Sequence, residues 1–282
     1  MFVARYNKGK IMKIKDFIQQ VYEWTDNNSA NYQITCDTLK AGDPEQELGS
    51  RVAVCMFATP DVIRAASDWG AKLLIVHEPT FYDHWDSQEN FEAQSGFKRK
   101  ILDMKKQLIE DRGLVIYRYH DHPHNRMPDM IMEGEVKYFG LTGNWSKGKY
   151  FGCNFFTLDQ ALSVRDLTAA LEKNLNIARI RICGCADADF MVKKIGLCFG
   201  TPGHLEEILE DCDVVLTGEI CEWSQGEFAI DCTELGIKKA ILVMGHACSE
   251  RDGMKLLAEL MPRQWPELEV KYFESGDAYR FV

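Results

Sequence analysis

Two stretches of the chain, residues 53–78 and 195–220, repeat one pattern of apolar and turn-forming residues. In each stretch an apolar run leads to a Thr-Pro pair, then to a segment of about ten residues compatible with a helix, and then to a second apolar run. Thr59 and Thr201 occupy the same place in the two copies. A threonine hydroxyl accepts from the free amides of a first helical turn, and a following proline has no amide to leave unpaired. We therefore expect a helix to begin at each pair.

Both copies continue through a further helix into a third apolar run. Residues 98–112 lead into 114–119 in the first copy, and residues 227–235 lead into 239–244 in the second. Short apolar runs that alternate with helices are typical of parallel strands buried on both faces. The sequence therefore predicts an α/β fold made of two intertwined α/β/α repeats, each with the order βαβαβ.

The stretch between the copies has a different pattern. Thr157 and Ser163 are each expected to begin a helix, the second through a capping box closed by Asp166. Residues 167–175 are expected to form an amphipathic helix, and residues 177–183 a strand. We predict three segments, which are a first α/β repeat at 12–125, a connecting α+β segment at 126–190, and a second repeat at 191–282 that packs with the first.

Most of the histidines follow the ends of apolar runs, where open α/β sheets bind their ligands. Five of the seven histidines lie there together with carboxylates. The residues at these ends are His77, Glu78, His120, His122, His124, Glu219, His246 and Glu250. Imidazole and carboxylate groups are ligands of divalent transition metals, so we expect a metal site at the converging strand ends.

Local spacing predicts how some of these side chains face. His246 and Glu250 are four residues apart, so the first turn of a following helix would bring them together. His120, His122 and His124 alternate, and the proline after His122 favours an extended backbone before it. An extended segment would place all three on one face. Taken alone, His122 is more commonly a structural histidine than a ligand.

Composition excludes several classes of function. The chain has a formal charge of −10, whereas direct nucleic-acid binding requires basic patches. No apolar stretch approaches the ~18 residues of a membrane span, and the N-terminus lacks the apolar core of a signal peptide, so we expect a cytoplasmic protein. The ten cysteines are scattered and are expected to be reduced. Cys183 and Cys185 form a close pair, a weaker candidate for metal ligands.

Several motifs, in a fixed order, resemble those of the Nif-three-like family, whose members are also known as GTP cyclohydrolase I type 2 homologues. They are Gly-Asp-Pro (42–44), Ala-Thr-Pro (58–60), Ile-Val-His-Glu-Pro (75–79), His120-x-x-x-His124, Thr-Gly-Glu (217–219) and Gly-His-x-x-x-Glu (245–250). The resemblance covers residues 34–124 and 192–260. It implies a dinuclear metal centre inside an α/β fold, and assembly into ring-shaped homohexamers.

The chain departs from the family pattern at two positions. Glu78 stands where the family has a second histidine, and His124 stands where it has an aspartate. Because a histidine and a carboxylate are exchanged, the implied ligand set keeps four imidazoles and two carboxylates. The set is His77, Glu78, His120, His124, His246 and Glu250. We expect it to hold two divalent ions of zinc, iron, manganese or nickel.

Two metal ions bridged by a carboxylate such as Glu250 would activate water for hydrolysis. We therefore expect a metal-dependent hydrolase acting on an unidentified small substrate, with nucleotide-like compounds among the candidates. Glu219 is expected to act as a general base or as an anchor for a ligand, and a purely structural role is the equal alternative. The alternative is a non-catalytic metal-binding scaffold or a regulatory protein that binds a partner, because a family's site does not establish its chemistry.

Overall fold

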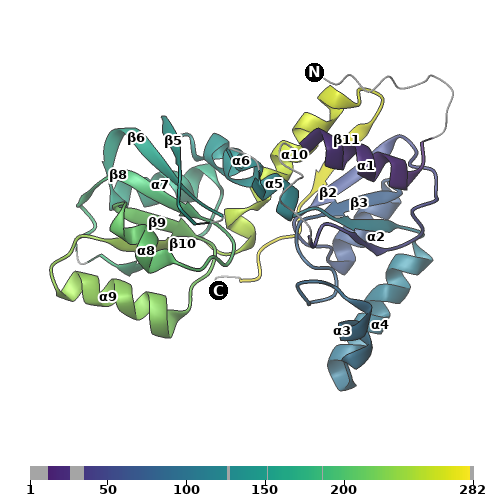
Figure 1. Ribbon diagram of the computed structural model, residues 1–282, viewed down its shortest axis with the longest axis horizontal. Helices are drawn as coiled ribbons and strands as arrows, with labels where there is room; N and C mark the ends of the chain where they lie inside the picture. Colours follow the sequence, from purple (N-terminus) through teal and green to yellow (C-terminus); the bar gives the residue numbers. More distant parts are fainter. Residues whose placement is uncertain (1–11, 26–34, 126–127, 151, 186, 280–282) are drawn as a thin grey trace. The chain divides into compact units, whose positions relative to one another are not determined.

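The computed structural model describes residues 12–25, 35–125, 128–150, 152–185 and 187–279, which form a mixed α/β protein with two sheets (Figure 1). The chain divides into two compact units. The first is Met1–Arg126 with Met254–Ser275, and the second is Met127–Gly253 with Gly276–Val282. Among the helices of the described residues, none has the length and apolar character needed to cross a membrane.

The first unit is built on a five-stranded sheet of order β1-β4-β3-β2-β11. Its strands are β1 (Leu39–Ala41), β2 (Arg51–Cys55), β3 (Leu73–Val76), β4 (Val115–Arg118) and β11 (Glu269–Phe273). All neighbouring strands are parallel except β1 and β4. Every residue of β3 and β4 is buried, as expected of parallel strands covered on both faces.

Helices on this sheet supply the apolar core of the first unit. They are α1 (Ile14–Thr25), α2 (Pro60–Asp68), α3 (Gln88–Ala93), α4 (Gly96–Asp111), α5 (Asp121–Asn125) and, from Met254 onward, α10 (Arg251–Gln264). Val62 and Ile63 of α2 join Leu102 and Ile109 of α4 in one buried cluster with Leu74 of β3. Helices α2 and α4 therefore cover the same face of the sheet.

The second unit is built on a six-stranded sheet of order β5-β6-β8-β9-β10-β7. Its strands are β5 (Gly143–Lys147), β6 (Cys153–Ser163), β7 (Arg181–Gly184), β8 (Met191–Cys198), β9 (Val214–Thr217) and β10 (Ala240–Val243). Strands β8, β9 and β10 are parallel, and the other neighbours are antiparallel.

Helices cover both faces of the second sheet. They are α6 (Met130–Phe139), α7 (Val164–Asn174), α8 (Leu205–Glu210) and α9 (Glu227–Glu234), with a π-helical turn η2 (Glu222–Gly226) and a 3-10 turn η3 (Ala247–Ser249). Val136 of α6 and Leu171 of α7 share a buried cluster with Leu216 of β9. Ile208 of α8 shares another cluster with Val215 of the same strand. Leu216 and Val215 point to opposite faces because side chains alternate along a strand.

The predicted duplication of the α/β repeat is confirmed. β2, α2, β3, α4 and β4 of the first unit follow the same order as β8, α8, β9, α9 and β10 of the second, with α3 inserted in the first. At the carboxyl ends of the strands, Val76 of β3 pairs with Arg118 of β4, and Thr217 of β9 pairs with Val243 of β10. Residues after β3 and β4 therefore leave the first sheet at one edge, and residues after β9 and β10 leave the second sheet at the equivalent edge.

The two Thr-Pro pairs behave differently. Thr59 caps α2 as predicted, and its hydroxyl accepts a hydrogen bond from the backbone N of Val62 at 3.3 Å. The prediction is wrong at Thr201, because α8 begins only at Leu205, after His204 in a left-handed conformation. The hydroxyl of Thr201 instead lies 3.1 Å from Nδ1 of His246.

The stretch between the two repeats is more strand-rich than its sequence suggests. Ser163 caps α7 as predicted and accepts from the backbone N of Asp166 at 3.0 Å. The helix predicted at Thr157 is wrong, because this residue lies inside β6 and pairs with Lys194 of β8. The strand predicted at 177–183 is present as the shorter β7. The described part of this stretch belongs to the second compact unit, and the boundaries of the three predicted segments stay a prediction.

Candidate metal centre

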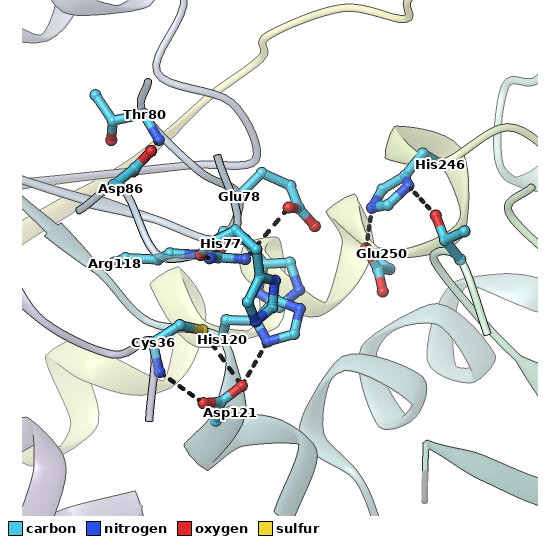
Figure 2. A network of polar contacts seen from close by, with 12 residues as sticks. Cys36, His77, Glu78, Thr80, Asp86, Arg118, His120, Asp121, His246 and Glu250 are labelled. Atoms are coloured by element: carbon cyan, nitrogen blue, oxygen red, sulfur yellow. Dashed lines mark hydrogen bonds and ion pairs between the residues drawn. The ribbon is translucent and has the colours of Figure 1, made fainter. Parts of the chain in front are cut away.

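Three histidines converge in the first unit beyond the ends of β3 and β4. His77 follows β3, His120 follows β4, and His124 lies on α5. Their ring centroids are 4.6 Å apart for His77 and His120, 5.2 Å for His77 and His124, and 5.0 Å for His120 and His124. One ligand nitrogen of each ring lies within 4.8 Å of the others. Figure 2 shows His77 beside His120, and three imidazoles at these distances are a ligand set for a divalent ion.

His77 is fully buried, and the backbone holds its ring. Its Nδ1 lies 3.2 Å from the carbonyl oxygen of Tyr119, which can only accept, so Nδ1 carries the proton and Nε2 the lone pair. That Nε2 lies 3.3 Å from Nε2 of His124. Burial lowers the pKa of His77 well below 6.5, and the nearby His120 and His124 lower it further. The imidazole is therefore neutral at pH 7, the form that binds a metal.

Asp121 orients the ring of His120 (Figure 2). Its Oδ1 lies 2.9 Å from Nδ1 of His120, and its Oδ2 accepts from the backbone N of Cys36 and from the hydroxyl of Thr35, both at 2.8 Å. Burial acting alone would raise the pKa of Asp121, but these hydrogen bonds, that of His120 foremost, bring it below its ordinary value. The carboxylate holds the proton of His120 on Nδ1 and leaves Nε2 for a ligand, as carboxylate–histidine pairs do around metal ions.

A buried carboxylate, Asp37, forms the turn that carries His120 and His124. Its Oδ1 accepts from the backbone N of His120 at 2.6 Å and of Asp121 at 2.8 Å, and its Oδ2 accepts from that of His122 at 2.9 Å. Because three consecutive backbone amides bond to Asp37, the chain turns from β4 into α5. This turn places His120 and His124, which are four residues apart, on the same side. The predicted extended segment is wrong for this reason, and the proline after His122 lies in the first helical turn, where proline is tolerated.

His122 lies outside the histidine cluster. Its Nδ1 is 2.5 Å from Oδ2 of Asp37, and its ring centroid is 4.0 Å from that of Tyr22. The side chain is buried in these contacts. The expectation that His122 shares a face with His120 and His124 is therefore wrong, whereas its interpretation as a structural histidine agrees with these partners.

Glu78 forms an ion pair with a buried arginine. Nη2 of Arg118, the last residue of β4, lies 3.4 Å from Oε2 of Glu78. The same guanidinium donates through Nε to the carbonyl oxygen of His77 at 2.9 Å and through Nη1 to that of His84. Arg118 therefore fixes the chain on both sides of Glu78. The three-histidine cluster does not include Glu78.

In the second unit, His246 lies between two carboxylates. Its Nδ1 is 2.7 Å from Oε1 of Glu219, and its Nε2 is 3.2 Å from Oε2 of Glu250. His246 follows β10 at the start of η3 and Glu250 ends that turn, so the predicted effect of their spacing is confirmed. Figure 2 shows this pair side by side. Glu250 is buried, whereas Glu219 is half-exposed.

Close backbone packing holds this second group in place. Gly200 has a φ of +67°, and a Cβ there would lie 2.6 Å from Oε1 of Glu250. A Cβ on Gly218 would lie 2.6 Å from Oγ of Ser249. That hydroxyl accepts from the backbone N of Gly200 at 3.0 Å and donates to the carbonyl oxygen of His246 at 2.8 Å. Only glycine allows the chain to approach this closely at positions 200 and 218.

The predicted site residues fall into two groups, each held within one unit. The first unit brings together His77, His120 and His124 and ties Glu78 to Arg118. The second unit brings together His246, Glu250 and Glu219.

The residues that the sequence interpretation missed are Asp37, Asp121, Cys36 and Arg118. The role of Asp121 could have been inferred from the sequence, because its carboxylate directly follows His120. The role of Asp37 could not, because its contact with His120 spans 83 residues of sequence.

The fold and the histidine cluster define a class of α/β proteins that carry candidate metal ligands at the ends of parallel strands. A model of the family Duf34/NIF3 (NGG1p interacting factor 3) matches residues 12–277, and the chain therefore belongs to the Duf34/NIF3 family. This confirms the resemblance predicted from the sequence motifs. No curated protein matches the chain.

Solved structures share this fold over nearly the whole chain. The protein ybgI, of unknown function, has a TM-score of 0.74 at 19% identity, with 95% of this chain and 100% of that chain covered. A Bacillus cereus protein related to NIF3 has a TM-score of 0.73 at 13% identity, with 97% and 100% covered. Reduced HcgD from Methanocaldococcus jannaschii has a TM-score of 0.70 at 17% identity, with 93% and 98% covered. At these identities the likeness shows the fold alone.

Proposed function

We propose that this protein binds a divalent transition metal ion at His77, His120 and His124. The observation that supports the proposal is that three imidazoles converge. In two of them, an acceptor oxygen holds Nδ1 and leaves Nε2 for a metal ion. The carbonyl oxygen of Tyr119 holds Nδ1 of His77, and Asp121 holds Nδ1 of His120. A divalent ion bound to the three rings would replace the hydrogen bond that now joins Nε2 of His77 and Nε2 of His124.

The proposal extends to hydrolysis of a small substrate with a carbonyl or phosphoryl group, nucleotide-like compounds included. A metal ion held by these histidines would supply Lewis-acid chemistry, lowering the pKa of water and polarising such a group. Three protein ligands are the number found in catalytic zinc sites, which keep a further position open. Tyr119 and Asp121 would keep the two rings in place, so that little rearrangement is needed during turnover.

We further propose that His246 and Glu250 are ligands of a second ion, which gives two ions per chain, with zinc, iron, manganese and nickel as candidates. Glu219, bonded to Nδ1 of His246, would orient that ring. Because Glu219 is half-exposed, its carboxylate is also accessible as a general base for water. Assembly into homohexamers and a cytoplasmic location stay predictions.

Metal analysis of protein purified without a histidine tag tests the binding step. We expect two equivalents per chain in the wild type and a clear loss in His124→Ala. His204→Asn is the matched control, because His204 is an exposed histidine with positive φ, which asparagine tolerates. The comparison is repeated in a Cys36→Ser background, because the thiol of Cys36 lies near His120 and is itself a candidate metal ligand. Equal metal content with and without His124→Ala in that background would contradict the proposed ligand set.

A second experiment separates a hydrolase from a metal-binding scaffold. The wild type is assayed on phosphodiesters, cyclic amides and nucleotides, and any activity is compared with that of Glu250→Gln. We expect turnover to be abolished in the variant while its urea-unfolding midpoint stays unchanged. Two bound ions without turnover on any of these compounds, together with a destabilised variant, would support the scaffold instead.

A further inference from the structure

Cys36, His120 and Asp121 form another cluster of metal-ligating groups in the first unit. One ligand atom of each lies within 4.8 Å of the others. Sγ of Cys36 lies 3.3 Å from Oδ1 of Asp121, and Nδ1 of His120 lies 2.9 Å from the same oxygen. Figure 2 shows these three side chains together. Cys36 is buried, but the side chains of His120 and Asp121 are 21% and 15% exposed, which leaves a route for an ion.

The two separations that involve Asp121 are close to those of ligands around one small divalent ion. With bonds of about 2.3 Å to sulfur and about 2.0 Å to nitrogen and oxygen, a tetrahedral ion sets its ligands roughly 3.3–3.5 Å apart. Cys36 and Asp121 are already at that separation. His120 and Asp121 would have to move apart by only about 0.4 Å.

The charge around this cluster also favours a cation. The carboxylate of Asp37 is buried, and its Oδ1 lies 3.8 Å from Sγ of Cys36. Asp121 adds a second carboxylate, whereas the buried cation nearby, Arg118, is paired with Glu78. Sulfur and imidazole ligands select zinc and similar soft ions over magnesium or calcium.

We propose that Cys36, Nδ1 of His120 and Asp121 form a thiolate-containing zinc site. Zinc binding would release the thiol proton of Cys36 to solvent and shift the imidazole proton of His120 from Nδ1 to Nε2. His120 therefore serves one site at a time, the three-histidine cluster through Nε2 or the thiolate site through Nδ1. The thiolate site needs neither His77 nor His124, so it does not rest on the proposed function.

Titration of the His124→Ala variant with cobalt(II) tests this site, because that variant lacks the complete histidine cluster. A thiolate ligand gives cobalt an intense charge-transfer band in the near ultraviolet, whereas imidazole and carboxylate ligands do not. We expect the band to reach a plateau within two equivalents of cobalt, because His246 and Glu250 offer another site in the same variant. We expect it to be absent when Cys36→Ser is added to the variant. No band in His124→Ala, or a band that survives Cys36→Ser, would overturn the proposal.

Cys183→Ser in the same His124→Ala background is the matched control, because the close pair Cys183 and Cys185 is another source of thiolate. The band should be unchanged there, and its loss would overturn the assignment to Cys36. If the Cys36→Ser protein does not fold, cadmium-113 NMR of His124→Ala replaces it. A cadmium signal coupled to the β-protons of Cys36 supports the site, and cadmium bound without that coupling overturns it. Metal loss on adding His124→Ala to Cys36→Ser, in which the thiolate site is absent, reports on the proposed function separately.

Discussion

The two repeats share a scaffold but differ in the side chains that their strand ends carry. In the first unit, the residues after β3 and β4 supply three imidazoles. In the second unit, the residues after β9 and β10 supply one imidazole, His246, between the carboxylates Glu219 and Glu250. The duplicated strands therefore determine where functional side chains lie, and the loops after them determine which chemistry is present.

The two loops are also held in different ways. In the first unit, the side chain of Asp37 accepts from three consecutive backbone amides and so shapes the turn into α5. In the second unit, Gly200 and Gly218 allow close contact of backbone with Glu250 and Ser249. Substitutions in the first loop should therefore act by removing a hydrogen-bond acceptor. Substitutions in the second loop should act by adding a side chain where there is no room for one.

The largest effect is expected for Asp37→Ala in the first unit. Three backbone amides and Nδ1 of His122 would lose their acceptor in a buried place, which should lower the free energy of unfolding by at least ~3 kcal/mol. Urea unfolding measures this, and Asp61→Ala, at an exposed position, should change stability by less than about 0.5 kcal/mol. A loss below ~1 kcal/mol for Asp37→Ala would mean that the turn does not depend on this carboxylate.

Gly200→Ala in the second unit should have the next largest effect. The positive φ and the close contact with Glu250 should together lower the free energy of unfolding by about 2 kcal/mol. Gly203→Ala is the matched control, because a Cβ there meets no atom within 4 Å. Equal stability of the two variants in urea unfolding would show that the second loop tolerates a side chain.

The buried His77 should make the stability of the ion-free protein depend on pH. Its folded pKa lies well below the unfolded value of 6.5, because burial, foremost, and the two neighbouring histidines disfavour the charged form. The unfolded chain therefore binds more protons below pH 6.5. The contribution of neutral His77 to the free energy of unfolding is complete above pH 6.5. As the pH decreases from 6.5 toward the folded pKa, this contribution falls by up to ~1.4 kcal/mol per pH unit.

Urea unfolding of the wild type and of His77→Gln at about pH 7.5 and about pH 5.5 measures this contribution. The variant should lose less stability than the wild type between the two conditions. Identical losses would show that His77 is not held in its neutral form.

The smallest effects are expected for alanine substitutions at the threonines of the two Thr-Pro pairs. Thr59→Ala removes the cap of α2 and should cost about 1 kcal/mol. Thr201→Ala removes no helix cap and should cost less than about 0.5 kcal/mol. Thermal unfolding of both variants measures the difference, and a larger cost at Thr201 would point to its contact with His246 as the more important one.

Features set by neighbours in sequence could be predicted. The apolar runs predicted the two parallel repeats, and the spacing of His246 and Glu250 predicted their contact. His77 was expected at the end of a buried strand and lies there. These features depend on periodicity and on intervals of a few residues, which the sequence displays.

Features set by distant residues could not be predicted. The proline after His122 favoured an extended segment, but Asp37 turns that segment into α5 from far along the chain. At Thr201 the same Thr-Pro pair does not begin a helix, because its hydroxyl contacts His246 and the chain first passes through a left-handed residue at His204. In both places, a tertiary contact overrides the local preference.

The function proposed for this protein depends on one metal ion bound by His77, His120 and His124. Anomalous diffraction at the zinc edge, from crystals of the zinc-loaded wild-type protein, tests it most directly. We predict a peak at about 2.0–2.1 Å from Nε2 of all three histidines. Saturated crystals with no anomalous peak among these rings would contradict it.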